Sequence, residues 1–101
     1  VSAVRARIYQ QLADGEPSLE SVADSLGMAA RTLSARLARR SLRFADILDG
    51  LRQSLAELYL QDSALSLTEI ALLLGFAESS SFSRAFRRWR GTSPNQWRRG
   101  G

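Results

Sequence analysis

Arginine is the residue type in this chain whose placement most directly suggests a chemistry. All fourteen basic residues are arginine, against ten acidic residues, which gives a net charge of +4. Residues 30–43 contain five arginines and residues 79–101 contain six, and neither segment contains an acidic residue. A guanidinium group can bind a phosphate or the edge of a guanine through two parallel hydrogen bonds. The two clusters therefore predict two surfaces that bind a polyanion.

The residue types that are missing argue against catalysis. The chain contains no cysteine, histidine or lysine, and these residues supply the commonest general base, most zinc ligands and the usual amine nucleophile. We therefore expect no enzyme activity, no metal site and no cofactor. We also expect no membrane association, because the longest apolar run, residues 70–74, is far too short to cross a bilayer.

A repeat organises the chain: residues 18–44 and residues 66–93 carry the same pattern. Leu26-Gly27 in the first copy corresponds to Leu74-Gly75 in the second, 48 positions later, and one added residue makes the later offset 49. Each copy has a short apolar segment, a glycine, and a second apolar segment with several arginines. This order is typical of a helix-turn-helix, in which the glycine ends the first helix. Two copies predict two units that read nucleic acid.

The elements that must position these arginines are all helices. Every segment with a clear apolar period has the three-and-four spacing of a helix, so we predict an all-α fold. The seven expected helices span about residues 2–13, 19–26, 30–40, 44–61, 67–74, 79–90 and 94–98. The predicted organisation is two helix-turn-helix subdomains joined by a long connector helix, with domains over residues 1–43, 44–61 and 62–101. The connector would be roughly 27 Å long.

Polar residues and glycines mark the ends of these helices. Ser18 and Ser93 are expected N-caps. Ser66 and Glu69 fit a capping box, in which each side chain binds the backbone N–H of the other residue. Gly50 lies inside the connector helix, where it costs up to about 1 kcal/mol relative to alanine. We expect Gly50 to mark close packing or a bend.

The second helix of each unit should have one buried face and one face open to a ligand. With Leu33 and Leu37 inward in the first unit, and Phe82 and Phe86 inward in the second, the arginines and serines point outward. The aromatic residues, including Trp89, are expected in the core. The N-terminal half of such a helix lies deepest in a major groove and reads the bases. The expected base-contacting residues are Arg31, Ser34, Ala35, Ser79, Ser80, Ser83 and Arg84. The expected phosphate-contacting residues are Thr32, Arg36, Arg39, Ser81, Arg87, Arg88 and Arg90.

Other interpretations of these residues stay open. Ser79 or Ser80 could cap the helix instead of contacting a base, and the arginines near the helix ends could instead interact with the helix dipole. For the whole chain, the alternatives are a helical protein-interaction module, whose arginines contact an acidic partner, and a catalytic domain. DNA binding predicts two half-sites one helical turn apart and an affinity that falls steeply with salt.

Several longer motifs accompany the arginines of both copies. They are Val22-Ala23, Leu26-Gly27-Met28 and Arg31-Thr32-Leu33 in the first copy, and Ile70-Ala71, Leu74-Gly75-Phe76, the run from Ser81 to Trp89 and the run from Gly91 to Pro94 in the second. These residues resemble the DNA-binding domain of AraC/XylS-type transcription regulators, over about residues 5–99. Two positions depart from the family pattern. Ala29 stands where a serine cap is usual, and Ser41-Leu42-Arg43 replaces a glycine-containing turn.

The resemblance implies a function for the whole chain. Domains of this family have seven helices and insert their two units into successive major grooves on one side of double-stranded DNA. The base-contacting residues carried over from the family motif are those derived above. The resemblance also implies a bacterial regulator in the cytoplasm, associated with the nucleoid, and often an activator that contacts RNA polymerase. We expect the full-length protein to have an N-terminal effector-sensing or dimerisation domain.

Overall fold

Residues 2–100 form seven helices, as the sequence predicts. The computed structural model describes residues 2–100, which form helices and no strands. The helices are α1 (Ser2–Leu12), α2 (Leu19–Ser25), α3 (Ala30–Arg39), α4 (Phe44–Leu60), α5 (Leu67–Leu73), α6 (Ser79–Arg90) and α7 (Pro94–Gly100). The all-α fold is therefore confirmed. The largest difference from the expected boundaries is in α7, which continues to Gly100. None of the helices within residues 2–100 combines the length and the apolar character that a membrane span requires.

The first unit, α1 to α3, encloses an aliphatic core. Val4, Ile8 and Leu12 form one buried stripe along α1, as their three-and-four spacing predicts. Ala23 of α2 is fully buried, and a residue of this size lets α2 and α3 approach closely at their contact. Leu33 of α3 completes the same core. The residues of this unit's core are small and branched, with no aromatic ring among the fully buried ones.

The second unit, α5 to α7, is built on the same plan around aromatic rings. Phe82 and Phe86 of α6 are fully buried, and their ring centroids lie 6.0 Å apart in an edge-to-face arrangement. Trp97 of α7 packs edge-on against Phe86 at 5.8 Å, and Trp89 packs against the same ring at 6.3 Å. Such geometries add about 0.5–1.5 kcal/mol per pair beyond the area that they bury. The prediction that these aromatic residues form a core is confirmed.

The predicted helix caps are present. Ser18 caps α2 and forms a capping box with Ser21, in which each hydroxyl accepts the other residue's backbone N–H at 3.0 and 3.2 Å. Ser66 and Glu69 form the predicted box at α5, with both distances 3.1 Å. The backbone N–H of Ser66 holds the pKa of the Glu69 carboxyl below its ordinary value, and the Ser66 side chain adds to this effect. Ser93 accepts the N–H of Gln96 at the start of α7.

The connector helix α4 contributes to both cores. Ile47 and Leu48 are buried with the first unit, and Ala56 and Leu60 are buried with the second. The division of the chain at residues 43 and 61 stays a prediction, since α4 packs on both sides. The expectation of close packing at Gly50 is wrong, because a Cβ atom placed there would meet nothing within 4 Å.

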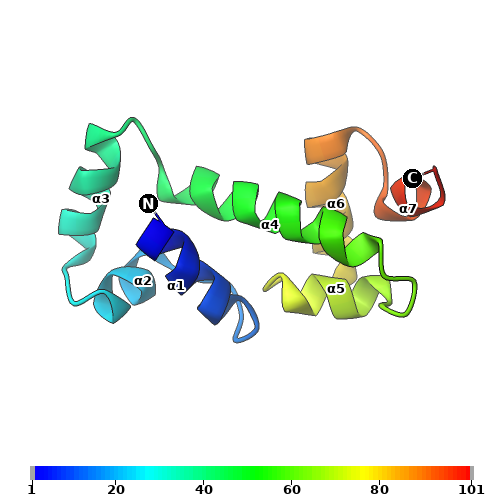
Figure 1. The fold of residues 1–101 in the computed structure, drawn as a ribbon, viewed down its shortest axis with the longest axis horizontal. Coiled ribbons are helices and arrows are strands. Elements are labelled where there is room, and N and C mark those ends of the chain that lie inside the picture. Colours follow the sequence, from blue (N-terminus) through cyan, green and yellow to red (C-terminus); the bar gives the residue numbers. More distant parts are fainter. Residues whose placement is uncertain (1, 101) are drawn as a thin grey trace.

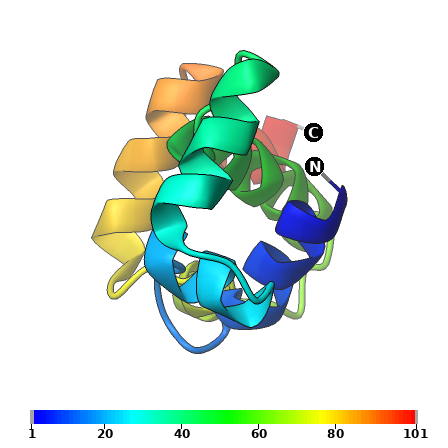
Figure 2. The same cartoon turned by 90° about the vertical axis from the view of Figure 1, so that its left-hand side faces the viewer.

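The molecule is elongated along α4. Its extents are 43 × 25 × 20 Å, and Figure 1 shows α4 (green) running between the two units, with α3 (cyan) at one end and α6 (yellow to orange) beside the other half. Both α3 and α6 start at the lower side of this view and run upward. Figure 2 shows the molecule end-on, with the two helices again running upward and α1 on the other side of the molecule. Helices α3 and α6, the second helix of each helix-turn-helix and called the recognition helices from here on, are therefore aligned in direction and separated along the long axis.

Candidate nucleic-acid interface

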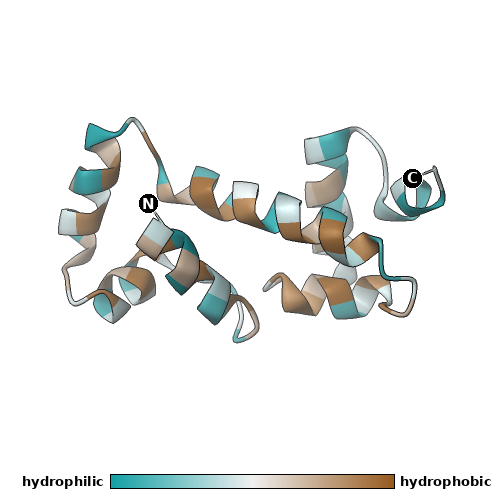
Figure 3. Cartoon of the chain, viewed as in Figure 1, coloured by the Kyte–Doolittle hydropathy of each residue, from teal (hydrophilic) through white to brown (hydrophobic). Residues whose placement is uncertain are grey.

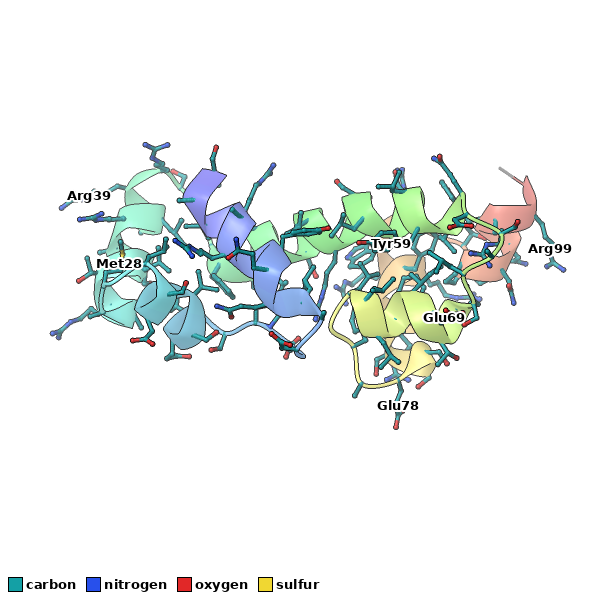
Figure 4. The ribbon with its side chains drawn as sticks, turned by 60° about the horizontal axis from the view of Figure 1, so that its bottom comes forward. Met28, Arg39, Tyr59, Glu69, Glu78 and Arg99 are labelled. Carbon is teal, nitrogen blue, oxygen red and sulfur yellow. The ribbon has the colours of Figure 1, made fainter. Side chains whose placement is uncertain are left out.

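The outer face of α3 is exposed along its length. Leu33 and Leu37 are 3% and 4% exposed and hold the helix to the first core. All six candidate residues on this helix are exposed, namely Arg31, Thr32, Ser34, Ala35, Arg36 and Arg39. Five residues of this helix line one shallow surface depression: Arg31, Thr32, Ala35, Arg36 and Arg39. In Figure 4, Arg39 projects from α3 away from the body of the protein.

The two ends of α3 have residues that are unfavourable at helix caps. Ala29 is the N-cap and has no side-chain hydrogen bond to the helix. At the other end Ser41 has a φ of 58°, which is the left-handed region that glycine adopts most easily. Its N–H bonds to the carbonyl of Ala38, and the N–H of Leu42 bonds to that of Leu37, which is the Schellman pattern of a helix end. Both departures from the family pattern therefore fall at caps.

The outer face of α6 carries the second set of candidates. Phe82, Ala85 and Phe86 face the core. Among the candidates, Ser80, Arg84, Arg87, Arg88 and Arg90 are exposed, while Ser79, Ser81 and Ser83 are half-buried. The helix ends at Gly91 with a φ of 75°, the left-handed conformation that suits glycine. Figure 3 shows hydrophilic residues (teal) near the C-terminal ends of α3 and α6, and mostly apolar residues (brown) along α4.

Neither Ser79 nor Ser80 caps α6. The N-cap is Glu78, which precedes the helix and makes no side-chain cap bond. Ser80 instead donates its hydroxyl to the Glu78 carboxylate at 3.2 Å. Glu78 is an exposed acid at the start of the recognition helix, and it points away from the protein in Figure 4. Glu78 was not among the contact residues predicted from the sequence. Its position directly before the helix could have indicated it, because a glutamate there can accept a hydrogen bond from a cytosine amino group.

The arginines of the two units differ in their partners. Arg88 forms an exposed ion pair with Asp49 of α4 at 3.2 Å, and Arg90 pairs with Glu57 of the same helix. Within residues 2–100, Arg31, Arg36 and Arg39 of α3 form no ion pair. The Arg88–Asp49 pair is exposed, and such pairs contribute about 0–1 kcal/mol, so a phosphate can replace Asp49. The pairing of these α4 acids with α6 was not predicted from the sequence.

A second missed residue is Arg52 of α4, which is 4% exposed. Its Nε donates to the Leu74 carbonyl at 2.7 Å, and its Nη1 donates to Glu16 at 3.3 Å. The sequence did contain a signal. Arg52 falls on the same stripe of α4 as the buried Leu48, Ala56 and Leu60, at a spacing of four residues.

Comparison with known proteins assigns the family. Residues 22–100 match the model of a family described as a helix-turn-helix domain. The chain is 44% identical over 87 residues to the HTH-type transcriptional regulator VirS of Mycobacterium tuberculosis, covering 86% of this chain and 26% of VirS. It is 44% identical over 82 residues to the ornithine utilization regulator of Pseudomonas aeruginosa, covering 81% of this chain and 24% of that protein.

This chain belongs to the AraC-type helix-turn-helix family. The predicted family is thereby confirmed, and so is the prediction of a regulator's domain rather than an enzyme. This AraC-type domain spans about a quarter of the length of the relatives that it matches.

Solved structures of AraC-type domains have the same fold. The C-terminal domain of AraT, a response regulator from Geobacillus stearothermophilus, superposes with a TM-score of 0.86 at 31% identity and covers 97% of this chain and 82% of that one. The DNA-binding domain of AdpA, solved in complex with a target DNA, superposes with a TM-score of 0.79 at 25% identity and covers 98% of this chain and 89% of that one. The seven-helix architecture is thus that of an AraC-type DNA-binding domain.

Proposed function

We propose that this AraC-type domain binds specific sequences of double-stranded DNA by inserting α3 and α6 into successive major grooves. The observation that carries the proposal is that both helices run in the same direction and expose their arginines along a molecule 43 Å long. Successive major grooves on one side of B-DNA are about 34–36 Å apart. The 43 Å length is an upper limit on the separation of α3 and α6, because α7 lies beyond α6 along the long axis (Figure 1).

The residues are assigned by their depth in the groove. The N-terminal residues of each recognition helix contact base edges, and these are Arg31, Ser34, Ala35, Ser79, Ser80, Ser83 and Arg84. Residues at the flanks and C-terminal ends contact phosphates, and these are Thr32, Arg36, Arg39, Ser81, Arg87, Arg88 and Arg90. Arg84 and Arg31 each suit a bidentate contact with guanine, which is worth about 1–3 kcal/mol of discrimination.

The same proposal covers the rest of the full-length protein. We infer a bacterial transcription regulator that acts in the cytoplasm on nucleoid DNA, with an N-terminal effector-sensing or dimerisation domain. Among the relatives, RhrA of Rhizobium meliloti and RhaS of Escherichia fergusonii are named as activators. Activation through contact with RNA polymerase is therefore the regulatory output that we propose for this protein.

Selection of bound duplexes from a random DNA pool tests the function. We expect one enriched sequence with two conserved half-sites. Affinity for this duplex should then fall steeply with salt, because six to ten phosphate contacts correspond to a loss of about 10³- to 10⁵-fold between 50 and 200 mM. Arg5→Ala serves as the control, since Arg5 is an exposed arginine of α1 outside both recognition helices and its loss should leave the affinity nearly unchanged. A chain that binds no duplex at low salt would instead favour an acidic protein partner.

A further inference from the structure

A buried arginine joins the two units of the domain. Arg52 lies on α4 with 5% of its side chain exposed. It bonds to the Leu74 carbonyl in the turn of the second unit, and to Glu16 in the loop between α1 and α2 of the first. Its guanidinium group lies over the ring of Phe76, with Cζ 4.2 Å from the ring centroid. One side chain thus contacts both units at the place where they approach each other.

The backbone of the two units is in close contact at the same place. Gly75 has a φ of +85°, and a Cβ atom built on it would lie 2.7 Å from the carbonyl oxygen of Gly15 and 3.1 Å from that of Leu12. It would also lie 3.1 Å from Nη2 of Arg52. The turn of the second unit therefore packs directly on the end of α1, with no space for a side chain. Arg52 closes one side of this contact.

Stability alone does not account for an arginine at this position. Burying a charge is costly unless every donor is paired, and Nη2 of Arg52 has no hydrogen-bond partner among the described residues. Glu16, its ionic partner, has 70% of its side chain exposed, which weakens the pair. An apolar residue would continue the stripe of Leu48, Ala56 and Leu60 without burying a charge, although the Leu74 carbonyl would lose its donor. The bonds of Arg52 differ from apolar packing in one respect, which is that they have direction.

We propose that Arg52 is a positioning residue that sets the orientation of α3 relative to α6, and thereby the spacing between half-sites that the domain accepts. The inference rests on the proposed function, since it concerns how two DNA-reading units act together. Without Arg52 the units stay joined by α4 but lose the bonds that fix their relative rotation. Preorganisation of two linked binding units raises the affinity for targets whose geometry matches, and lowers it for the others.

The spacing preference provides the test. The duplex selected from the random pool is compared with duplexes that have one base pair inserted or deleted between the half-sites, which rotates one half-site by about 35°. The wild-type chain should lose at least about tenfold in affinity on insertion. In Arg52→Met this ratio should fall below about threefold, because binding to the selected spacing weakens while binding to the altered spacing does not. Arg5→Met is the matched control and should keep the wild-type ratio.

The opposite result is equally clear. If Arg52→Met weakened binding to all spacings by the same factor, Arg52 would only stabilise the fold and the inference would be wrong. If Arg52→Met does not fold, Arg52→Lys takes its place. Lysine keeps the charge, but it cannot lie flat on Phe76 while bonding to Leu74 and Glu16 together. The ratio of affinities for the selected and altered spacings should therefore fall in Arg52→Lys as well. An unchanged ratio in a folded Arg52→Lys would contradict the proposal.

A measurement without DNA separates this inference from the proposed function. The chain has no cysteine, so spin labels can be attached at Ala38→Cys in α3 and Asn95→Cys in α7, both exposed positions. The distance distribution between the labels should be narrow with Arg52 present and clearly broader in Arg52→Met. A distribution of equal width in both proteins would overturn the inference even if DNA binding were established. If the wild-type chain binds no duplex, but the distance distribution between the labels is still broader in Arg52→Met than in the wild type, the proposed function alone would be overturned.

Discussion

The two helix-turn-helix units present similar surfaces but have different interiors and ends. Neither α3 nor α6 has a side-chain bond at its N-cap, but the first unit has an aliphatic core and Ser41 in the left-handed position after α3. The second has an aromatic core, and Gly91 in the left-handed position after α6. Both nonetheless expose arginine and small polar residues on the recognition helix. The shared function therefore constrains the outer face of each unit, while stability is obtained in different ways.

The turns of the two units differ in the same manner. Gly27 and Gly75 occupy equivalent positions of the repeat and have similar φ angles of 73° and 85°. A Cβ atom at Gly27 would meet nothing within 4 Å, whereas one at Gly75 would overlap the Gly15 carbonyl oxygen. The turn of the second unit is therefore also a contact with the first unit. A positive φ at the turn is therefore common to both helix-turn-helix units, whereas the absence of a side chain at Gly75 is required by the contact between the units.

The largest expected effect comes from substituting these two glycines. Gly27→Ala should lower the free energy of unfolding by about 1–2 kcal/mol, the strain of a positive φ. Gly75→Ala should lower it by about 2–5 kcal/mol, because overpacking adds about 1–3 kcal/mol to that strain. Gly75→Val should be worse still, since β-branched residues tolerate positive φ poorly. Urea unfolding of each variant measures the difference. Equal losses for the two alanine variants would show that the contact between the units contributes nothing.

The next largest effect separates the base contact proposed for Arg84 from the phosphate contact proposed for Arg88, both in α6. Arg84→Ala should cost about 1–3 kcal/mol for the preferred base pair and relax the preference at that position. Arg88→Ala should weaken all duplexes nearly alike and reduce the salt slope by about one. Arg31→Ala provides the comparison in the first unit, and should relax a base pair in the other half-site. Competition titrations with single-base variants of the selected duplex measure these changes in specificity. Identical changes in Arg84→Ala and Arg88→Ala would refute the assignment of base and phosphate contacts by depth.

Better capping residues at the two ends of α3 should stabilise the first unit. Ala29→Ser supplies the side-chain bond that the N-cap of α3 lacks and should add about 0.5–2 kcal/mol of stability. Ser41→Gly removes the strain of a φ of 58° and should add up to about 1 kcal/mol. Amide hydrogen exchange of α3 reports the gain locally, with α6 of the same protein as the reference. Faster exchange in α3 of either variant would mean that these residues have another role.

The smallest effect is a difference in acid sensitivity. Because the pKa of Glu69 is lowered in the folded state, its capping interaction stabilises the second unit above the ordinary pKa of the carboxyl and is lost as the pH falls through the lowered one. The equivalent box of α2 uses the hydroxyl of Ser21, which does not titrate in this range. Glu69→Gln should therefore reduce the loss of stability on acidification. Thermal unfolding at pH 7 and below pH 4 tests this, and an unchanged pH profile would contradict it.

Sequence periodicity was sufficient to predict the helices and the outward faces of α3 and α6. The stripes of Leu33 with Leu37 and of Phe82 with Phe86 depend only on local spacing, which a sequence shows directly. The role of Arg52 could not be predicted, because its partners lie 22 and 36 residues away in the chain. The pairing of Arg88 with Asp49, 39 residues apart, was missed for the same reason. Contacts between units depend on how the helices are placed in space.

Hydroxyl-radical footprinting of the selected duplex tests the central claim most directly. Insertion of α3 and α6 into successive major grooves predicts two protected patches on one face of the duplex, with centres about 10–10.5 base pairs apart, one from each recognition helix. Arg84→Ala and Arg31→Ala should weaken protection mainly in one patch each. A single protected patch, or two patches on opposite faces, would contradict the proposal that α3 and α6 occupy successive major grooves.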